Sequence, residues 1–124
     1  MKTLRVGIST YEEMKARTLA VARGKHRVAE EPRVWFTSTE SFAKVLSAGN
    51  RELLRIISEA APSSIEDLAQ LTGRAKSNLS RTLKTMVGYG IIRLEPGERG
   101  RLAPKVTYDR VQLDLAIAAT PKRR

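Results

Sequence analysis

The stretch from residue 74 to residue 90 gathers cationic and hydrogen-bonding side chains on one side of a predicted helix. With about 100° between successive residues, Leu79, Leu83 and Met86 fall within one narrow apolar sector. No acidic residue occurs anywhere between positions 74 and 90. Guanidinium and amide groups on such a helix can form paired hydrogen bonds with base edges in a DNA major groove. The cationic and hydrogen-bonding residues of this stretch that could contact DNA are Arg74, Lys76, Ser77, Asn78, Arg81 and Lys84.

A basic β-hairpin is predicted directly after this helix. Residues 91–95 have an extended pattern, a Pro-Gly pair follows, and a returning strand includes Val106 and Tyr108. Such a hairpin is typical of a wing, which contacts phosphates beside the major groove and commonly places an arginine in the minor groove. Alternatively, the charges only protect an exposed strand edge. The basic residues are Arg99 and Arg101 at the tip and Lys105 on the returning strand.

These side chains divide into two expected roles. Arginine suits guanine and asparagine suits adenine, so Arg81 and Asn78 are the candidates for contacts with base edges. The remaining candidates are expected to contact phosphates or the minor groove, and they are Arg74, Lys76, Ser77, Lys84, Arg99, Arg101 and Lys105. Residues 74–105 hold eight basic and two acidic residues, a net of +6, whereas residues 50–73 hold two basic and four acidic residues, a net of −2. This asymmetry is typical of a nucleic-acid-binding face.

A second helix must position the basic one. Ser63 and Glu66 have the spacing of a capping box, which predicts a helix start at Ser63. Ala69, Gly73 and Leu79 stand where a helix-turn-helix needs a small residue, a turn glycine and a buried aliphatic residue. The pair is therefore interpreted as a helix-turn-helix, with an unrelated two-helix hairpin as the alternative.

Two more helices are predicted upstream. Thr37 and Glu40 form a second predicted capping box, and Gly49 is expected to end that helix. Asn50 is then the expected cap of a helix over residues 51–60, which directs Leu53, Leu54, Ile57 and Ala60 inward. Trp35 precedes both helices and is interpreted as a packing anchor, with stacking on a base as the alternative.

The two ends of the chain carry strand patterns. Residues 4–9 alternate apolar and polar side chains, and Thr10 is expected to cap a helix that runs to about Arg23. Tyr11 is expected on the apolar stripe of that helix, and the stripe either packs in the core or contacts a second copy in a dimer. Gly24 is expected to end the helix before a polar linker over residues 25–33. Val111, Leu113, Leu115 and Ile117 predict a last strand. The first and last strands are expected to pair either with each other or across the axis of a dimer.

Composition excludes several classes of function. The 124 residues carry a formal net charge of +10, which favours a polyanionic partner. There is no cysteine, and the single histidine, His26, is expected to be a surface residue in the linker. We therefore expect no enzyme, no metal and no cofactor. No apolar run is long enough to span a bilayer, so we expect a cytoplasmic, nucleoid-associated protein without a membrane partner.

Residues 37–108 resemble the winged helix-turn-helix transcriptional regulators of the broad MarR/ArsR kind, through LAQLTGRAKSNLSRTLKTMVGYGIIRLE. With VWFTSTESFAKVLS ahead of it, this region is similar to small prokaryotic antitoxins, some of them encoded beside a toxin of the TumE type. The resemblance implies a homodimer on a palindromic operator, with Ser77, Asn78, Arg81 and Lys84 as recognition-helix positions. Ala75 stands where such helices often have a capping Ser or Thr, so we expect an uncapped start.

The expected fold is α+β and mainly α. A winged helix-turn-helix domain is expected over residues 34–108, after a β-α extension over residues 1–33 that serves dimerisation or a partner. A C-terminal strand and basic tail follow over residues 109–124. The expected function is sequence-specific binding of double-stranded DNA as an autorepressor. The alternative is an antitoxin that binds a protein toxin through the β-α extension or the tail at 122–124. The third hypothesis is a protein that binds RNA, or one that binds chromatin nonspecifically.

Overall fold

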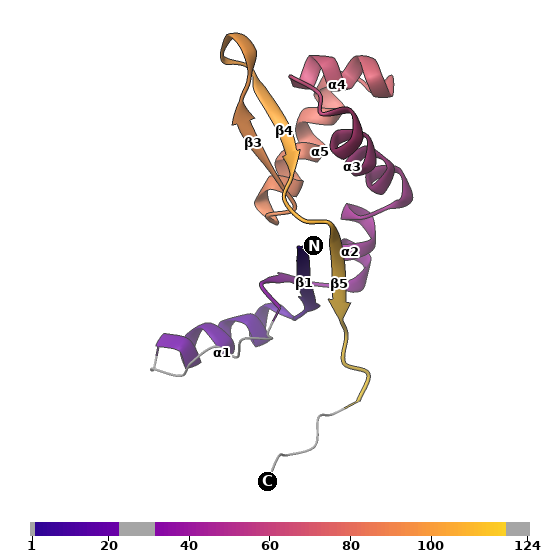
Figure 1. Cartoon of the computed structure of the whole chain (residues 1–124). Helices are drawn as coiled ribbons and strands as arrows, with labels where there is room; N and C mark the ends of the chain where they lie inside the picture. Colours follow the sequence, from indigo (N-terminus) through magenta and orange to yellow (C-terminus); the bar gives the residue numbers. More distant parts are fainter. Residues whose placement is uncertain (1, 23–31, 119–124) are drawn as a thin grey trace.

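The computed structural model describes residues 2–22 and 32–118, and within them the chain is a small α+β protein that is mainly helical (Figure 1). This confirms the predicted α+β class with mainly helical content. The described helices are α1 (Tyr11–Ala22), α2 (Thr39–Val45), α3 (Ala48–Ala60), α4 (Ile65–Thr72) and α5 (Lys76–Gly88). The strands are β1 (Thr3–Ile8), β2 (Val34–Phe36), β3 (Ile92–Pro96), β4 (Leu102–Val106) and β5 (Arg110–Asp114), with a 3-10 turn, Glu98–Gly100, between β3 and β4.

Three strands from distant parts of the chain form one parallel sheet in the order β2-β1-β5. Val6 of β1 lies opposite Val34 of β2 and Leu113 of β5, and Leu4 lies opposite Val111. All five side chains are part of the hydrophobic core or pack against it. The first and last strands therefore pair with each other inside one chain, which decides between the two pairings expected from the sequence.

The last strand is shorter than its alternating pattern predicts. Pairing with β1 ends at Asp114, opposite Gly7, because β1 ends at Ile8 and the chain continues into α1 at Tyr11. Leu115 and Ile117 lie beyond the strand and are exposed, Ile117 by 94%. The prediction that they continue the strand is wrong, since no neighbouring strand remains for them to pair with.

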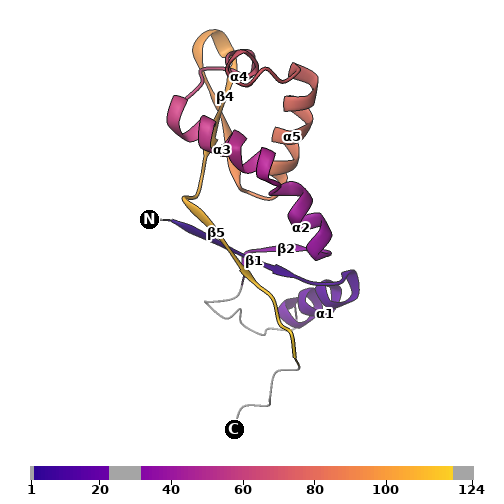
Figure 2. The same cartoon turned by 90° about the vertical axis from the view of Figure 1, so that its right-hand side faces the viewer.

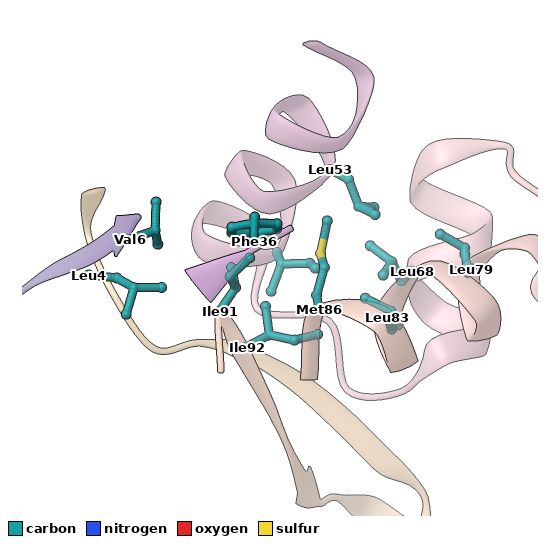
Figure 3. Packing of buried hydrophobic residues seen from close by; sticks show 11 residues of the cluster. Leu4, Val6, Phe36, Leu53, Leu68, Leu79, Leu83, Met86, Ile91 and Ile92 are labelled. Carbon is teal, nitrogen blue, oxygen red and sulfur yellow. The ribbon is translucent and has the colours of Figure 1, made fainter. Parts of the chain in front are cut away.

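Phe36 joins the sheet to the helices. Its ring is fully buried, stacks on Tyr89 at a centroid distance of 4.2 Å, and meets Phe42 edge-on at 5.3 Å. Figure 3 shows the rest of the core around it, with side chains from β1, α3, α4, α5 and β3 converging on one interior. The sheet and the helices thus share a continuous apolar core.

Trp35 lies on the other face of the sheet and packs over Gly7. A Cβ atom added to Gly7 would lie 2.5 Å from the indole Cζ3 and 3.1 Å from Pro32 Cγ. Only glycine allows the indole to approach the strand this closely. The interpretation of Trp35 as a packing anchor is therefore confirmed.

Gly7→Ala is expected to lower the free energy of unfolding by about 1–3 kcal/mol, because the new methyl group must displace the indole or the strand. Chemical unfolding followed by far-UV circular dichroism measures the change. Gly88→Ala is the matched control, since nothing lies within 4 Å of the added atom. There a helix gains an alanine, and stability is expected to hold or rise. Equal losses in both variants would contradict the packing described for Trp35.

The start of α4 differs from the prediction by one residue. Ser64, not Ser63, caps the helix, because its Oγ accepts a hydrogen bond from the Asp67 amide at 3.0 Å. The Asp67 carboxylate in turn accepts a hydrogen bond from the Ser63 amide at 3.0 Å. Two adjacent serines fit the same local rule, and Ser64 is the one that the fold buries.

The caps of α2 and α3 are also corrected. Ser38 rather than Thr37 caps α2, accepting from the Ser41 amide at 3.0 Å. Ser47 caps α3, so Gly49 and Asn50 lie inside the first turn of α3 instead of between two helices. Leu53 and Ile57 are buried and Leu54 is half-buried as expected, but Ala60 is exposed because α3 ends there.

At α1 the predicted cap is confirmed. Thr10 Oγ1 accepts a hydrogen bond from the Glu13 amide at 3.1 Å, and the Glu13 carboxylate accepts one from the Thr10 amide at 2.9 Å. The helix projects away from the sheet (Figure 1), and Tyr11 is 75% exposed, so this residue does not pack in the core. The alternative of a dimer contact stays a prediction.

Some expectations fall on residues 23–31 and 119–124, which lie outside the described part of the chain. They are the helix end at Gly24, the surface position of His26, most of the linker over residues 25–33, and the tail over residues 122–124. Among residues 2–22 and 32–118, no helix has the length and apolar character needed to cross a membrane.

Candidate nucleic-acid interface

Helices α4 and α5 meet at a tight turn formed by Gly73. Its φ of +75° is a left-handed conformation that suits glycine, and its amide donates to the Ala69 carbonyl at 2.8 Å. Helix α5 begins after Ala75 without a side-chain cap, as expected. The three residues predicted to be apolar anchors, Leu79, Leu83 and Met86, are all buried.

The opposite face of α5 is exposed. Ser77, Asn78, Arg81 and Lys84 all have exposed side chains, and burial of the other face holds the helix in this orientation. In the part of the chain that the structure describes, neither Arg81 nor Lys84 makes an ion pair. Both cations are therefore available to an external polyanion.

Strands β3 and β4 form the predicted hairpin, in antiparallel register with Arg93 opposite Lys105. Arg93 forms an ion pair with Glu95 on the same strand, and Lys105 is half-buried. Strand β4 ends at Val106, so the prediction that Tyr108 belongs to it is wrong. After Val106 the chain leaves β3 and approaches β1. The Thr107 amide still donates to the Ile91 carbonyl, directly before β3, whereas the Asp109 amide donates to the Lys2 carbonyl, directly before β1.

The hairpin tip lies against the start of α4, and both views place these elements at the end of the molecule remote from the sheet (Figures 1 and 2). A Cβ atom added to Gly97 would lie 2.8 Å from the Ser63 carbonyl oxygen. Arg99, at the turn, has a φ of 58° and an exposed side chain. No ion pair of Arg99 occurs within the described ranges.

One carboxylate connects α4, α5 and the hairpin. Glu66 accepts a hydrogen bond from Lys76 Nζ at 3.2 Å through one oxygen and pairs with Arg101 Nη1 at 2.9 Å through the other. The hydrogen bond from Lys76 and the charge of Arg101 lower the pKa of Glu66 below its ordinary value. The first turn of α5 and the hairpin tip therefore lie on either side of one acidic side chain.

Glu66→Gln is expected to reduce stability at neutral pH but not in acid. A carboxylate with a lowered pKa in the folded state stabilises the fold above its unfolded pKa of about 4.3, and that contribution disappears as the pH falls through the lowered value. Urea unfolding of both proteins across acidic and neutral pH should give curves that converge at the acid end. A constant offset at every pH would contradict the role of the Glu66 charge.

Arg74 contacts the protein itself rather than projecting freely. Its Nη2 donates to the Gly49 carbonyl at 2.9 Å, and its Nη1 donates to Asn50 Oδ1 at 3.3 Å. Asn50 in turn donates to the Val45 carbonyl at 3.0 Å. The half-buried Arg74 thus connects the turn before α5 to the start of α3 through hydrogen bonds.

The structure therefore sorts the nine predicted site residues into three groups. Arg74 is held by α3, and Lys76 and Arg101 are held by Glu66. The others make no ion pair within the described residues, and they are Ser77, Asn78, Arg81, Lys84, Arg99 and Lys105. Sequence reasoning missed Glu66 and Asn50 as partners of this surface, and assigned both only to helix starts. The sequence did offer one signal for Glu66, because an acidic residue in the helix directly before an acid-free basic helix is a natural ion-pair partner for it.

The described residues thus form a small α+β protein in which a basic helix and a basic hairpin lie next to each other. A family model described as HVO_A0114 matches residues 45–113, which is more than half of the chain and includes all of α3, α4, α5 and the hairpin. The chain therefore belongs to the HVO_A0114 family. No curated protein and no solved structure matches it.

Proposed function

We propose that the protein is a winged helix-turn-helix regulator that binds double-stranded DNA in a sequence-specific manner. In this proposal α4 and α5 are the helix-turn-helix, α5 enters the major groove, and the β3–β4 hairpin is the wing. The observation that carries it is the exposed, acid-free face of α5 opposite a buried face, beside a hairpin that shares the Glu66 carboxylate with α5.

The proposed roles follow the exposure of the side chains. Arg81 and Asn78 contact base edges, while Ser77, Lys84 and Arg99 contact phosphates or the minor groove. Lys76 and Arg101 are already paired with Glu66, whose negative charge reduces their net attraction for phosphates. Lys105 is half-buried on the hairpin stem, and Arg74 supports the turn. Binding over its own promoter would repress transcription by excluding polymerase, without catalysis.

Fluorescence anisotropy at one fixed salt concentration tests the proposal. The labelled duplex comes from the region upstream of the protein's own gene, and a shuffled duplex of equal length and composition is the control. A sequence-specific regulator binds its site about 10³-fold or more tightly than random DNA. Equal affinities for both duplexes would favour a nonspecific nucleic-acid binder, because phosphate contacts alone give little discrimination.

A homodimer is part of this proposal, since a palindromic operator requires two copies of α5. Among the described residues no strand pairs with the outer edges of β2 and β5, so these edges and α1 are the proposed surfaces for a second copy. Sedimentation equilibrium at micromolar concentration checks the oligomeric state. A monomer in the presence and absence of operator DNA would remove this part of the proposal.

A second candidate function is an antitoxin that neutralises a protein toxin, and it is compatible with DNA binding. The exposed apolar side chains of α1 and of the segment after β5 favour it, because these face solvent in the isolated chain. They are Tyr11, Leu19, Leu115 and Ile117. Co-purification with the product of the adjacent gene tests this candidate. An adjacent product that does not bind, and whose expression does not harm the cell, would argue against it.

A further inference from the structure

A groove of about 800 Å³ lies between α2 and α3 on one side and the segment that joins β4 to β5 on the other. Phe42 and Leu54 line it from the helices, and Val106, Tyr108 and Val111 line it from the joining segment and its flanking strands. This volume falls within the range that binds drug-sized molecules. The groove therefore offers apolar walls to a small ligand with a hydrocarbon or aromatic body.

The charged groups of the groove favour an anion, because three arginines and two carboxylates line it, a net charge of +1. Glu59 is paired with Arg55 at 2.6 Å, and one oxygen of Asp109 accepts from the Lys2 backbone amide at 2.7 Å. Arg110 makes no ion pair among the described residues, and Arg51 uses only its Nε, which donates to the Leu46 carbonyl at 3.1 Å. Two exposed guanidinium groups are thus left for a ligand.

We propose that this groove binds a small carboxylate with an apolar body. The hydrocarbon part lies against Phe42, Leu54 and Val111, and the carboxylate accepts charge-assisted hydrogen bonds from Arg51 and Arg110. A cation of the same size is disfavoured, because the lining carries a net charge of +1 and Glu59 is already paired with Arg55. This binding does not depend on the proposed DNA interface.

The position of the groove gives its ligand a physical consequence. The joining segment connects the hairpin to the sheet, and two backbone hydrogen bonds fix it. The Thr107 amide donates to the Ile91 carbonyl at 3.1 Å, and the Asp109 amide donates to the Lys2 carbonyl at 2.8 Å. A ligand that bridges this segment and α3 holds the hairpin base against the helices. Ligand binding therefore raises the unfolding temperature, since the unfolded chain has no such groove.

The experiment is a titration of the ¹⁵N-labelled full chain with octanoate and with phenylacetate, followed by amide chemical shifts. Octanamide, which has the same hydrocarbon body without the charge, is the control ligand. Saturable shifts are expected for at least one of the two acids at residues 46–51 and 106–111, with weaker binding of octanamide. The double variant R51Q/R110Q should bind about ten-fold more weakly, and Leu54→Trp should fill the groove and abolish binding.

R33Q is the matched control variant, because it removes an exposed arginine that lies outside the groove, directly before β2. It should leave the affinity for the acid unchanged. Absence of saturable shifts with both acids, equal binding of octanamide, or an equal loss in R33Q would each overturn the proposal. Because no DNA is present, these outcomes leave the proposed function untouched, and failure of DNA binding leaves the groove untouched.

Discussion

Arg81→Ala is expected to weaken binding to the cognate DNA site by about 1–3 kcal/mol and to relax the preference at one base pair. The guanidinium lies on the exposed face of α5 without an ion pair in the described residues, so its removal leaves no unpaired partner inside the protein. Anisotropy titrations with the wild-type site and with single base-pair variants measure both effects. Stability should change by less than about 0.5 kcal/mol, since the side chain is on the surface.

Arg99→Ala is the comparison that separates the two proposed roles. This cation lies at the hairpin turn and should contact phosphate or the minor groove, so its loss should weaken specific and shuffled DNA alike and reduce the salt slope by about one. Arg101→Ala should have a smaller effect than Arg99→Ala, because Arg101 is already paired with Glu66. If Arg81→Ala and Arg99→Ala changed binding to specific and shuffled DNA equally, the proposed division of roles would be wrong.

Phe36→Ala is expected to lower the free energy of unfolding by about 3–5 kcal/mol, which is a large fraction of a typical total of about 5–15 kcal/mol. The ring is fully buried and contacts Phe42 from α2 and Tyr89 at the end of α5. Its removal should therefore destabilise the sheet and the helices together. Urea unfolding followed by circular dichroism measures the loss.

Leu71→Ala provides the control, because Leu71 is of similar apolar character but 51% exposed. Its expected change lies within about 0.5 kcal/mol. A loss of less than about 1 kcal/mol for Phe36→Ala would show that the sheet and the helices do not share the core described above.

The features that the sequence predicts well are local. Leu79, Leu83 and Met86 recur at helical spacing, and the structure buries all three. Gly73 and Thr10 also act as expected, because a turn glycine and a helix cap depend on only a few neighbouring residues. Basic residues on the exposed face of α5 follow directly from the position of the apolar face.

The features that the sequence misses depend on contacts between distant segments. Adjacent hydroxyl residues such as Ser63 and Ser64 satisfy the same capping rule, and only tertiary packing selects between them. The sequence also left open whether β1 pairs with β5 or across a dimer axis, because the two strands lie more than 100 positions apart and an alternating pattern does not specify its partner. The partners of Glu66 and Arg74 are likewise set by the packing of α4, α5 and the hairpin.

Site-specific photo-crosslinking tests most directly whether α5 and the hairpin share one DNA-binding surface. A photoreactive residue is placed in turn at Lys84 on α5, at Arg99 on the hairpin, and at Arg55 on α3, all of which are exposed. The account predicts crosslinks to the same duplex from positions 84 and 99 and none from position 55. Crosslinks from position 55 in the absence of crosslinks from 84 and 99 would contradict it.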